Sequence, residues 1–317
     1  MRGIDAKNSC VFLRELFCHS KEKSYICRKI HDMELIKDFS ELSERLRKGK
    51  QCKVVAVEAI DDHSREAIER AEQEGWAEVK NIHLSSVEES AAEAVRCIRR
   101  GEAEVVMKGI LNTDVLLRAI INKDNREEGL LPVGNVLSHV SAMQIPAYHK
   151  MLFMSDAAVI PFPTLEQRIA MIRYVIQLCR VYGIDQPRIA LIHCTEKVSP
   201  KFPITLDYQK IVEMCQAGEF GNAIIDGPSD LKCAVDKESA DIKGIKSPLE
   251  GNADAVIMPD IEAANVYYKA ITAFTDTKLA VGLQGTSCPV TLTSRADSAE
   301  TKYNSLAMAC LQVLAEK

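Results

Sequence analysis

The hydrophobic positions of this chain repeat with two different periods from residue 33 to the C-terminus. Short apolar runs rich in β-branched residues predict strands at 53–60, 78–84, 104–109, 150–160, 188–194, 221–228, 253–260 and 289–292. Apolar residues spaced three and four apart predict helices at 33–50, 64–75, 87–101, 113–123, 165–182, 234–242, 263–274 and from about Ser298 onward. This alternation predicts an α/β fold with a mostly parallel sheet that helices cover on both faces.

Ligands of such folds collect where the carboxyl ends of strands meet the amino ends of helices. The familiar phosphate-binding sequences G-x-G-x-x-G and G-x-x-x-x-G-K-[S/T] are absent from the chain, as are H-E-x-x-H and G-x-S-x-G. Their absence argues against a simple Rossmann dehydrogenase, a P-loop kinase, a zinc protease and a serine hydrolase. Dehydrogenases built on other α/β folds remain open.

Composition narrows the class of protein further. The 317 residues carry a net charge of −5, which disfavours nucleic acid as a partner, and no apolar run approaches the about 20 residues of a membrane span. Eleven cysteines without paired spacing predict free thiols and a cytoplasmic setting. The first 32 residues form an extension of undetermined role, and its Cys18, His19, Cys27 and His31 match no common zinc spacing, so no metal is expected.

The segment 288–314 (CPVTLTSRADSAETKYNSLAMACLQVL) places hydroxyl groups and a guanidinium where a strand gives way to a helix. Unpaired backbone N–H groups and the helix dipole make such a junction suitable for an anion. Ser294 can orient a reacting oxygen or sulfur, and Arg295 can grip phosphate through two N–H groups. Asp297 and Glu300 have the spacing of a capping box, so a capped helix with a surface arginine explains the segment equally well.

A second strand–helix junction follows Gly109. Thr113 is expected to cap the helix, and Arg118 to lie five residues inside it, beside Asp114. An arginine among leucines is either a side chain that extends to solvent or a clamp for a ligand. Two junctions with a hydroxyl and an arginine, far apart in the sequence, favour a shared anion site.

Two later strands end in an acid beside proline, at Asp226 and Asp260. Asn265 and Lys269 follow, one helical turn apart, and present an amide and a cation on the same face. Turn chemistry and a solvated helix explain these residues as well as ligand binding does.

Four stretches together resemble the phosphate acetyl/butyryl transferase family, most of all its phosphate butyryltransferase branch: MKGILNTDVLLRAI, DGPSDLKCAV, SADIKGIKSPLEGNADAVIMPDIEAANVYYK and PVTLTSRADSAETKYNSLAMA. The resemblance is collinear from about Met33 to the C-terminus. It implies two α/β domains with an interdomain cleft, in a fold similar to the isocitrate/isopropylmalate dehydrogenases. Domain I is then 33–128 plus 284–317, and domain II is 129–283.

The resemblance also implies an activity: transfer of a short acyl group, butyryl or similar, between coenzyme A (CoA) and inorganic phosphate. CoA is then a substrate, no cofactor is tightly bound, and the protein is a homo-oligomer built from dimers. The family's Ser-Arg pair falls on Ser294 and Arg295, which are expected to be catalytic, and its second phosphate-side arginine falls on Arg118. Thr113, Asn265 and Lys269 are expected to bind substrate or phosphate.

Two positions depart from the family pattern. Thr301 stands where acetyl-specific relatives have the acid proposed to deprotonate the CoA thiol, so Asp297 is the expected substitute. Ala264 stands where relatives usually have glycine. These departures support a second hypothesis, a non-catalytic homologue that binds acyl-CoA or phosphate. A third, an NAD(P)-dependent dehydrogenase, needs clustered aspartates for a metal, and Asp226 and Asp260 are isolated.

Overall fold

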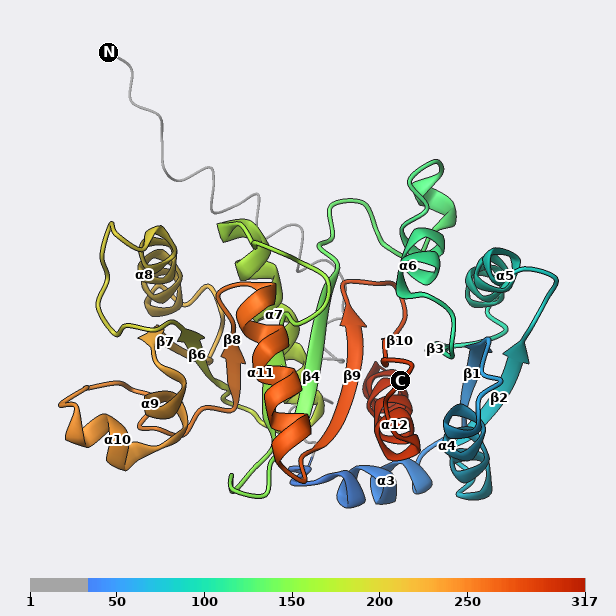
Figure 1. Ribbon diagram of the computed structural model, residues 1–317, viewed down its shortest axis with the longest axis horizontal. Helices are drawn as coiled ribbons and strands as arrows, with labels where there is room; N and C mark the ends of the chain where they lie inside the picture. Colours follow the sequence, from blue (N-terminus) through green and yellow to red (C-terminus); the bar gives the residue numbers. More distant parts are fainter. Residues whose placement is uncertain (1–33, 317) are drawn as a thin grey trace, which may run out of the picture.

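The computed structural model describes residues 34–316, whose ten strands form a single sheet with helices on both faces (Figure 1). The strands are β1 (Cys52–Val57), β2 (Ala77–Ile82), β3 (Val105–Lys108), β4 (Ser138–Gln144), β5 (Leu152–Ser155), β6 (Arg188–Ile192), β7 (Ile224–Ser229), β8 (Ala255–Ile257), β9 (Lys278–Gln284) and β10 (Val290–Thr291). The α-helices are α3 (Phe39–Arg47), α4 (Asp62–Gln73), α5 (Val87–Arg99), α6 (Thr113–Ile121), α7 (Leu165–Val181), α8 (Pro203–Gln216), α9 (Leu231–Val235), α10 (Lys237–Ile242), α11 (Ile261–Phe274) and α12 (Ala299–Glu316).

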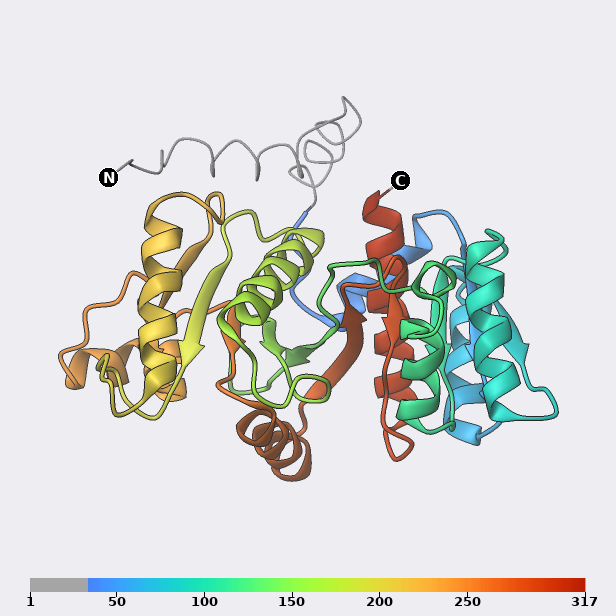
Figure 2. The same ribbon diagram turned by 90° about the horizontal axis from the view of Figure 1, so that it is seen from above.

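The sheet contains two parallel sets of strands that run in opposite directions. The order is β2-β1-β3-β10-β9-β4-β5-β8-β6-β7, and the first four strands are parallel to one another, as are the last four. β9 and β4 join the two sets through antiparallel pairing with each other and with β10 and β5. Figure 2 shows the two sets at opposite ends of the long axis, with β2 (blue-cyan) at one end and α8 (yellow) at the other.

Most of the pairings are therefore parallel, as expected. The expected boundary between domain I and domain II falls between β10 and β9, which are hydrogen-bonded neighbours in one continuous sheet. The division into two domains stays a prediction.

Both faces of the sheet are buried, because alternate side chains of each strand enter different cores. In β1, Val54 and Ala56 belong to the core that runs along one face of the whole sheet beneath α3, α4, α7, α8 and α12. Val55 and Val57 belong to the core on the other face, beneath α5 and α6. A third core lies beneath α9 and α11 on the β4–β8 half of the sheet. Burial on both faces explains why the parallel strands have continuous apolar sequences rather than alternating ones.

Several predicted elements differ from the structure in extent. The helix expected at 33–50 spans only Phe39–Arg47, the strand expected at 150–160 spans Leu152–Ser155, and the helix expected at 234–242 is divided into α9 and α10. β4, β9 and α8 were not predicted. The cysteine–histidine group at 18–31 lies outside the described residues. Among residues 34–316, none of the helices combines the length and the apolar character needed to span a bilayer.

Gly109, which follows β3 directly, lets two strand ends approach closely. A Cβ atom at this position would lie 2.1 Å from the carbonyl oxygen of Glu58, at the end of β1. Its backbone N–H donates to the carbonyl of Val57 (2.8 Å). The glycine is therefore required by backbone contact, which cannot relax by rotation of a side chain.

We expect Gly109→Ala to lower the free energy of unfolding by about 1–3 kcal/mol, because overpacking must displace the end of β1 or β3. Urea unfolding followed by circular dichroism measures the change. Gly49→Ala is the matched control, since its closest neighbours are the flexible Leu314 methyl groups at 2.9 and 3.0 Å, and its loss should be smaller. An unchanged midpoint for Gly109→Ala contradicts the interpretation.

Candidate active site

The carboxyl ends of three parallel strands, β1, β3 and β10, lie at the same edge of the sheet. A helix follows each of these strands. Asp61 caps α4 after β1, α6 begins at Thr113 after β3, and α12 begins at Ala299 after β10. β10 pairs with β3 in parallel, with Thr291 opposite Met107. Residues from distant parts of the sequence therefore meet at this edge, as expected for a ligand site in an α/β fold.

Ser294 and Arg295 project from a tight turn that Asp297 closes. The Asp297 carboxylate accepts a hydrogen bond from the Ser294 N–H (2.7 Å), and the Asp297 N–H donates to the Ser294 carbonyl (3.1 Å). Nδ1 of His63 lies 3.1 Å from the Asp297 carbonyl. Ser294 and Arg295 are exposed, so their side chains are free to meet a ligand.

The capping box expected from Asp297 and Glu300 is wrong. Ser298 caps α12, since its Oγ accepts a hydrogen bond from the Thr301 N–H (3.2 Å), and Glu300 forms an ion pair with Lys278 (2.7 Å). The carboxylate of Asp297 therefore does not cap α12. It accepts the hydrogen bond from the Ser294 N–H that closes the turn.

Two buried lysines flank this turn. Nζ of Lys108, at the end of β3, donates to the carbonyls of Thr293 (3.1 Å) and Gly109 (3.3 Å). Burial, and then the nearby charges of Lys302 and Arg295, lower the pKa of Lys108 to about 8. Lys302 and Arg295 therefore lie close enough to Lys108 for their charges to destabilise its protonated form.

Lys302 has a carboxylate partner. Its Nζ lies 2.7 Å from Oδ1 of Asp61 and 2.9 Å from Oγ of Ser64, and its side chain is fully buried. Burial raises the pKa of Asp61, but hydrogen bonds from Lys302 and Ser64 outweigh it and bring the pKa to about 2. The pair therefore joins the first turns of α12 and α4 as an ionised contact.

Groups on several elements of the fold affect the pKa of the Asp297 carboxyl group. Burial raises its pKa above the usual value, while the Ser294 N–H and the charges of Lys269, Lys302 and Lys108 act in the opposite direction. Lys269 belongs to α11, so that helix also borders the turn. Asp297 thus combines a raised pKa with cations on more than one side, which suits a group that exchanges a proton.

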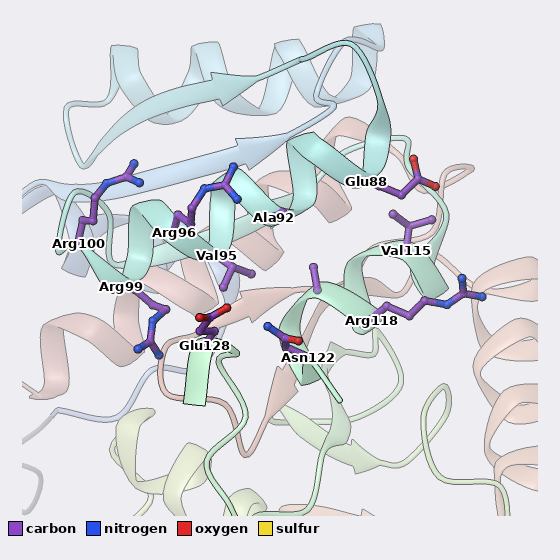
Figure 3. Close-up of a pocket in the computed structure, with 11 residues that line it drawn as sticks. Glu88, Ala92, Val95, Arg96, Arg99, Arg100, Val115, Arg118, Asn122 and Glu128 are labelled. Atoms are coloured by element: carbon purple, nitrogen blue, oxygen red, sulfur yellow. The ribbon is translucent and has the colours of Figure 1, made fainter. Parts of the chain in front are cut away.

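Arg118 and Thr113 lie on α6. Arg118 forms an ion pair with Asp114 (3.3 Å), as the spacing predicted, and its side chain is 81% exposed. It lines one end of a cavity of about 700 Å³ between α5 and α6, and its guanidinium points away from the centre of that cavity (Figure 3). Thr113 is not the helix cap: Asn112 holds that position without a side-chain bond, and Thr113 is the first helical residue.

On α11, Asn265 and Lys269 are exposed on the same face, as the spacing predicted. Nδ2 of Asn265 donates to the carbonyl of Ala157 (3.3 Å). Ala264, one of the two departures from the family pattern, is fully buried in the core beneath α11. Its methyl group therefore contributes to packing.

The structure thus brings Ser294, Arg295, Asp297 and Lys269 into one neighbourhood. Arg118 and Thr113 lie on the helix that starts at the same sheet edge, and whether Arg118 shares an anion with Arg295 stays a prediction.

Comparison with known proteins assigns the family. Residues 22–310 match the model of the phosphate acetyl/butaryl transferase family. The chain is 35% identical over 300 residues to a phosphate butyryltransferase from Clostridium acetobutylicum, covering 87% of this chain and 98% of the relative. It is also 35% identical over 295 residues to a phosphate acetyltransferase from Thermotoga maritima, covering 86% and 99%. The chain belongs to this family.

Solved structures of the family share the fold. A branched-chain phosphotransacylase from Enterococcus faecalis superposes with a TM-score of 0.75 at 28% identity, covering 83% of this chain and 99% of that one. A phosphotransacetylase from Streptococcus pyogenes gives 0.72 at 21% identity, covering 87% and 98%, which supports the fold alone. The predicted family and the mixed α/β fold are confirmed.

Sequence reasoning missed Lys108 and Lys302. Lys108 interrupts the apolar run VVMKG at the end of a strand, and Lys302 lies one position before Tyr303 on a helix whose other buried positions are largely apolar. A charged residue at a position that the hydrophobic pattern assigns to the interior was the available signal, because lysine is rarely buried without a function or a partner.

The aspartates relevant to a dehydrogenase have structural partners. Asp226 accepts a hydrogen bond from Oγ of Ser247 (2.6 Å), and Asp260 caps α11 through the Ala263 N–H (2.8 Å). Within residues 34–316, one group of possible metal ligands comes together, Glu196, Asp230 and Cys233. Lys243 binds both carboxylates of this group, so an ammonium already supplies the positive charge there.

We expect Lys302→Met to lower the free energy of unfolding by about 3 kcal/mol at pH 7, because it leaves a partly buried Asp61 carboxylate without its cation. The depressed pKa of Asp61 stabilises the native state above the ordinary aspartate range, and this stabilisation is lost as the pH falls towards 2. The difference between variant and wild type should therefore shrink between about pH 4 and pH 2.

Urea unfolding at a series of pH values measures this dependence. Lys278→Met is the control, since the pair of Lys278 with Glu300 is about half exposed and such pairs contribute at most about 1 kcal/mol. A deficit of Lys302→Met that is equally large at pH 2 and pH 7 contradicts the assignment.

Proposed function

We propose that this protein transfers a short acyl group reversibly between CoA and inorganic phosphate, giving acyl phosphate and free CoA. The observation that carries the proposal is the Ser294–Arg295 turn, set among Lys108, Lys302 and Lys269 at a sheet edge, in a member of the phosphate acetyl/butyryl transferase family. A phosphate dianion needs local positive charge and directional donors, and this edge supplies both.

In the direction of acyl-CoA synthesis, the thiolate of CoA attacks the carbonyl carbon of the acyl phosphate. Oγ of Ser294 donates a hydrogen bond to the developing negative charge, and Arg295 neutralises the phosphate as the C–O bond to it breaks. Arg118 is the second phosphate-side cation in this proposal, and Thr113, Asn265 and Lys269 border the substrate. The reverse reaction uses the same groups for phosphate attack on the thioester.

Asp297 is the proposed proton acceptor for the thiol. Its raised pKa makes it a stronger base than an ordinary aspartate, and its position beside the Ser294 N–H fixes its orientation. Thr301, which replaces the acid of acetyl-specific relatives, lies in the cap of α12, with its Oγ1 3.3 Å from Oγ of Ser298. The hydroxyl of Thr301 has no basic character at neutral pH.

Butyryl, or an acyl group of similar length, is the proposed substrate, on the likeness of the quoted motifs to the butyryltransferase branch. The relatives named for butyryl and for acetyl transfer are equally similar to this chain, at 35% identity. Assembly from dimers and a cytoplasmic location belong to the same proposal and rest on the family resemblance and the cysteine usage.

A non-catalytic homologue that binds acyl-CoA or phosphate is the second candidate, since Thr301 stands where acetyl-specific relatives have an acid. Ala264 gives it little support, because its methyl group is buried in the core beneath α11. Release of free thiol from acetyl-, propionyl-, butyryl- and branched acyl-CoA separates the candidates. The transferase releases thiol only with phosphate, fastest with butyryl-CoA; a binder releases none, and a dehydrogenase would require NAD(P).

We expect Arg295→Ala to lower kcat/KM for phosphate at least 100-fold with an unchanged unfolding midpoint, because an exposed guanidinium contributes to the ligand rather than to the core. The thiol-release assay with butyryl-CoA measures the effect. Arg65→Ala is the matched control: Arg65 is also exposed and pairs with Asp62 (3.1 Å), so its activity should stay within about twofold of wild type. Near-normal activity of Arg295→Ala removes this residue from the site.

A further inference from the structure

Lys108 is a buried cation without a neighbouring anion. The residue is 1% exposed, its backbone N–H donates to Oγ1 of Thr291 (3.2 Å), and its Nζ donates to the carbonyls of Thr293 and Gly109. Among residues 34–316, every ion pair within 4.0 Å involves other cations, so the ammonium has carbonyl dipoles but no carboxylate at contact distance. Two of its three N–H groups have partners, and the third remains available.

Lys302 provides an internal comparison. It is equally buried, but Oδ1 of Asp61 lies 2.7 Å from its Nζ. An unpaired buried charge is unfavourable, and proteins normally pair it or let it lose its proton. Lys108 therefore differs from Lys302 in a way that burial alone does not explain.

The hydrogen bond of Lys108 connects it with the proposed reaction. Its acceptor, the carbonyl of Thr293, immediately precedes Ser294 in the chain, so the ammonium lies directly beneath the turn that presents Ser294 and Arg295. The charged groups that act on Lys108 come from α12 (Lys302), from the turn (Arg295 and Asp297) and from the cap of α4 (Asp61). Of these charges, the two cations have the larger effect on the pKa of Lys108.

We infer that Lys108 is the internal cation of an anion subsite at the ends of β3 and β10, and that its amine takes up a proton when a phosphate or acyl-phosphate dianion binds beside Ser294 and Arg295. This inference rests on the proposed function and deepens it, since it names Lys108 as the group whose positive charge the bound dianion would neutralise.

The direction of the proton transfer follows from the charges. The pKa of Lys108 is about 8, so at pH 9 the amine is mostly neutral before phosphate binds. A dianion beside it favours the charged form and raises its pKa, so binding at pH 9 draws a proton from the solvent onto Nζ. At that pH phosphate is already a dianion, and Asp61, whose pKa is about 2, is ionised in both states.

Calorimetric titration of the full-length protein with inorganic phosphate at pH 9, in two buffers of different ionisation enthalpy, measures this uptake. We expect up to about 0.9 proton per phosphate bound, the fraction of amine that is neutral one pH unit above its pKa. The affinity for phosphate should also fall by up to tenfold for each pH unit above 8. Binding without proton uptake in the wild-type protein overturns the inference, whatever the variants do.

Two substitutions test the residue itself. Lys108→Arg keeps a charge that does not titrate, so phosphate should bind with no uptake, and wild-type uptake in this variant assigns the proton to another group. Lys108→Met should bind phosphate at least tenfold more weakly at pH 7.5. Lys53→Met is the control, since Lys53 is an exposed lysine of β1, and it should retain the wild-type uptake.

The outcome for the inference can be separated from that for the proposed function, because the titration uses neither CoA nor an acyl group. Proton-linked phosphate binding in a protein that releases no thiol would retain the subsite and reject acyl transfer. Phosphate-dependent thiol release with no proton uptake would retain acyl transfer and reject the role of Lys108.

Discussion

The parallel pairing of β10 with β3 is the contact on which the site depends. β10 has only two residues, and it is held in the sheet by β3 on one side and β9 on the other. The bond from the Lys108 N–H to Thr291 joins positions 183 apart in the sequence. Bringing such distant segments together has an entropic cost, which burial of apolar surface between α12 and the sheet offsets. The result is a rigid base for the turn that follows.

Charge at this edge is arranged around the turn. Lys302 is neutralised by Asp61 and joins α12 to α4, whereas Lys108 and Arg295 keep positive charge available. Asp297 holds the turn through the Ser294 N–H and remains within the field of the lysines. Donors and charges fixed before the substrate arrives need little reorganisation during the reaction, which is the main source of electrostatic catalysis. Acyl transfer to and from phosphate is a reaction that benefits from this arrangement.

The sequence predicted the parallel strands well, because strands buried on both faces have continuous apolar runs. It missed β4, whose Ser138, His139 and Ser141 are polar yet buried; the Ser138 hydroxyl and the His139 N–H are satisfied by Asp156, a contact that only the folded chain reveals. The junction at Ser294 and Arg295 was predictable from local chemistry and from the family motif. The buried lysines interrupt apolar patterns, which marks them as unusual, but their partners could not be predicted because these depend on the pairing of remote segments.

The most direct test of the account is to soak a crystal of the protein in inorganic phosphate and determine its structure. We expect a phosphate ion whose oxygens lie within hydrogen-bond distance of Oγ of Ser294 and the guanidinium of Arg295, with Nζ of Lys108 facing it across the turn. Phosphate bound only elsewhere, for example in the cavity between α5 and α6, with the Ser294–Arg295 turn left empty, would contradict the central claim.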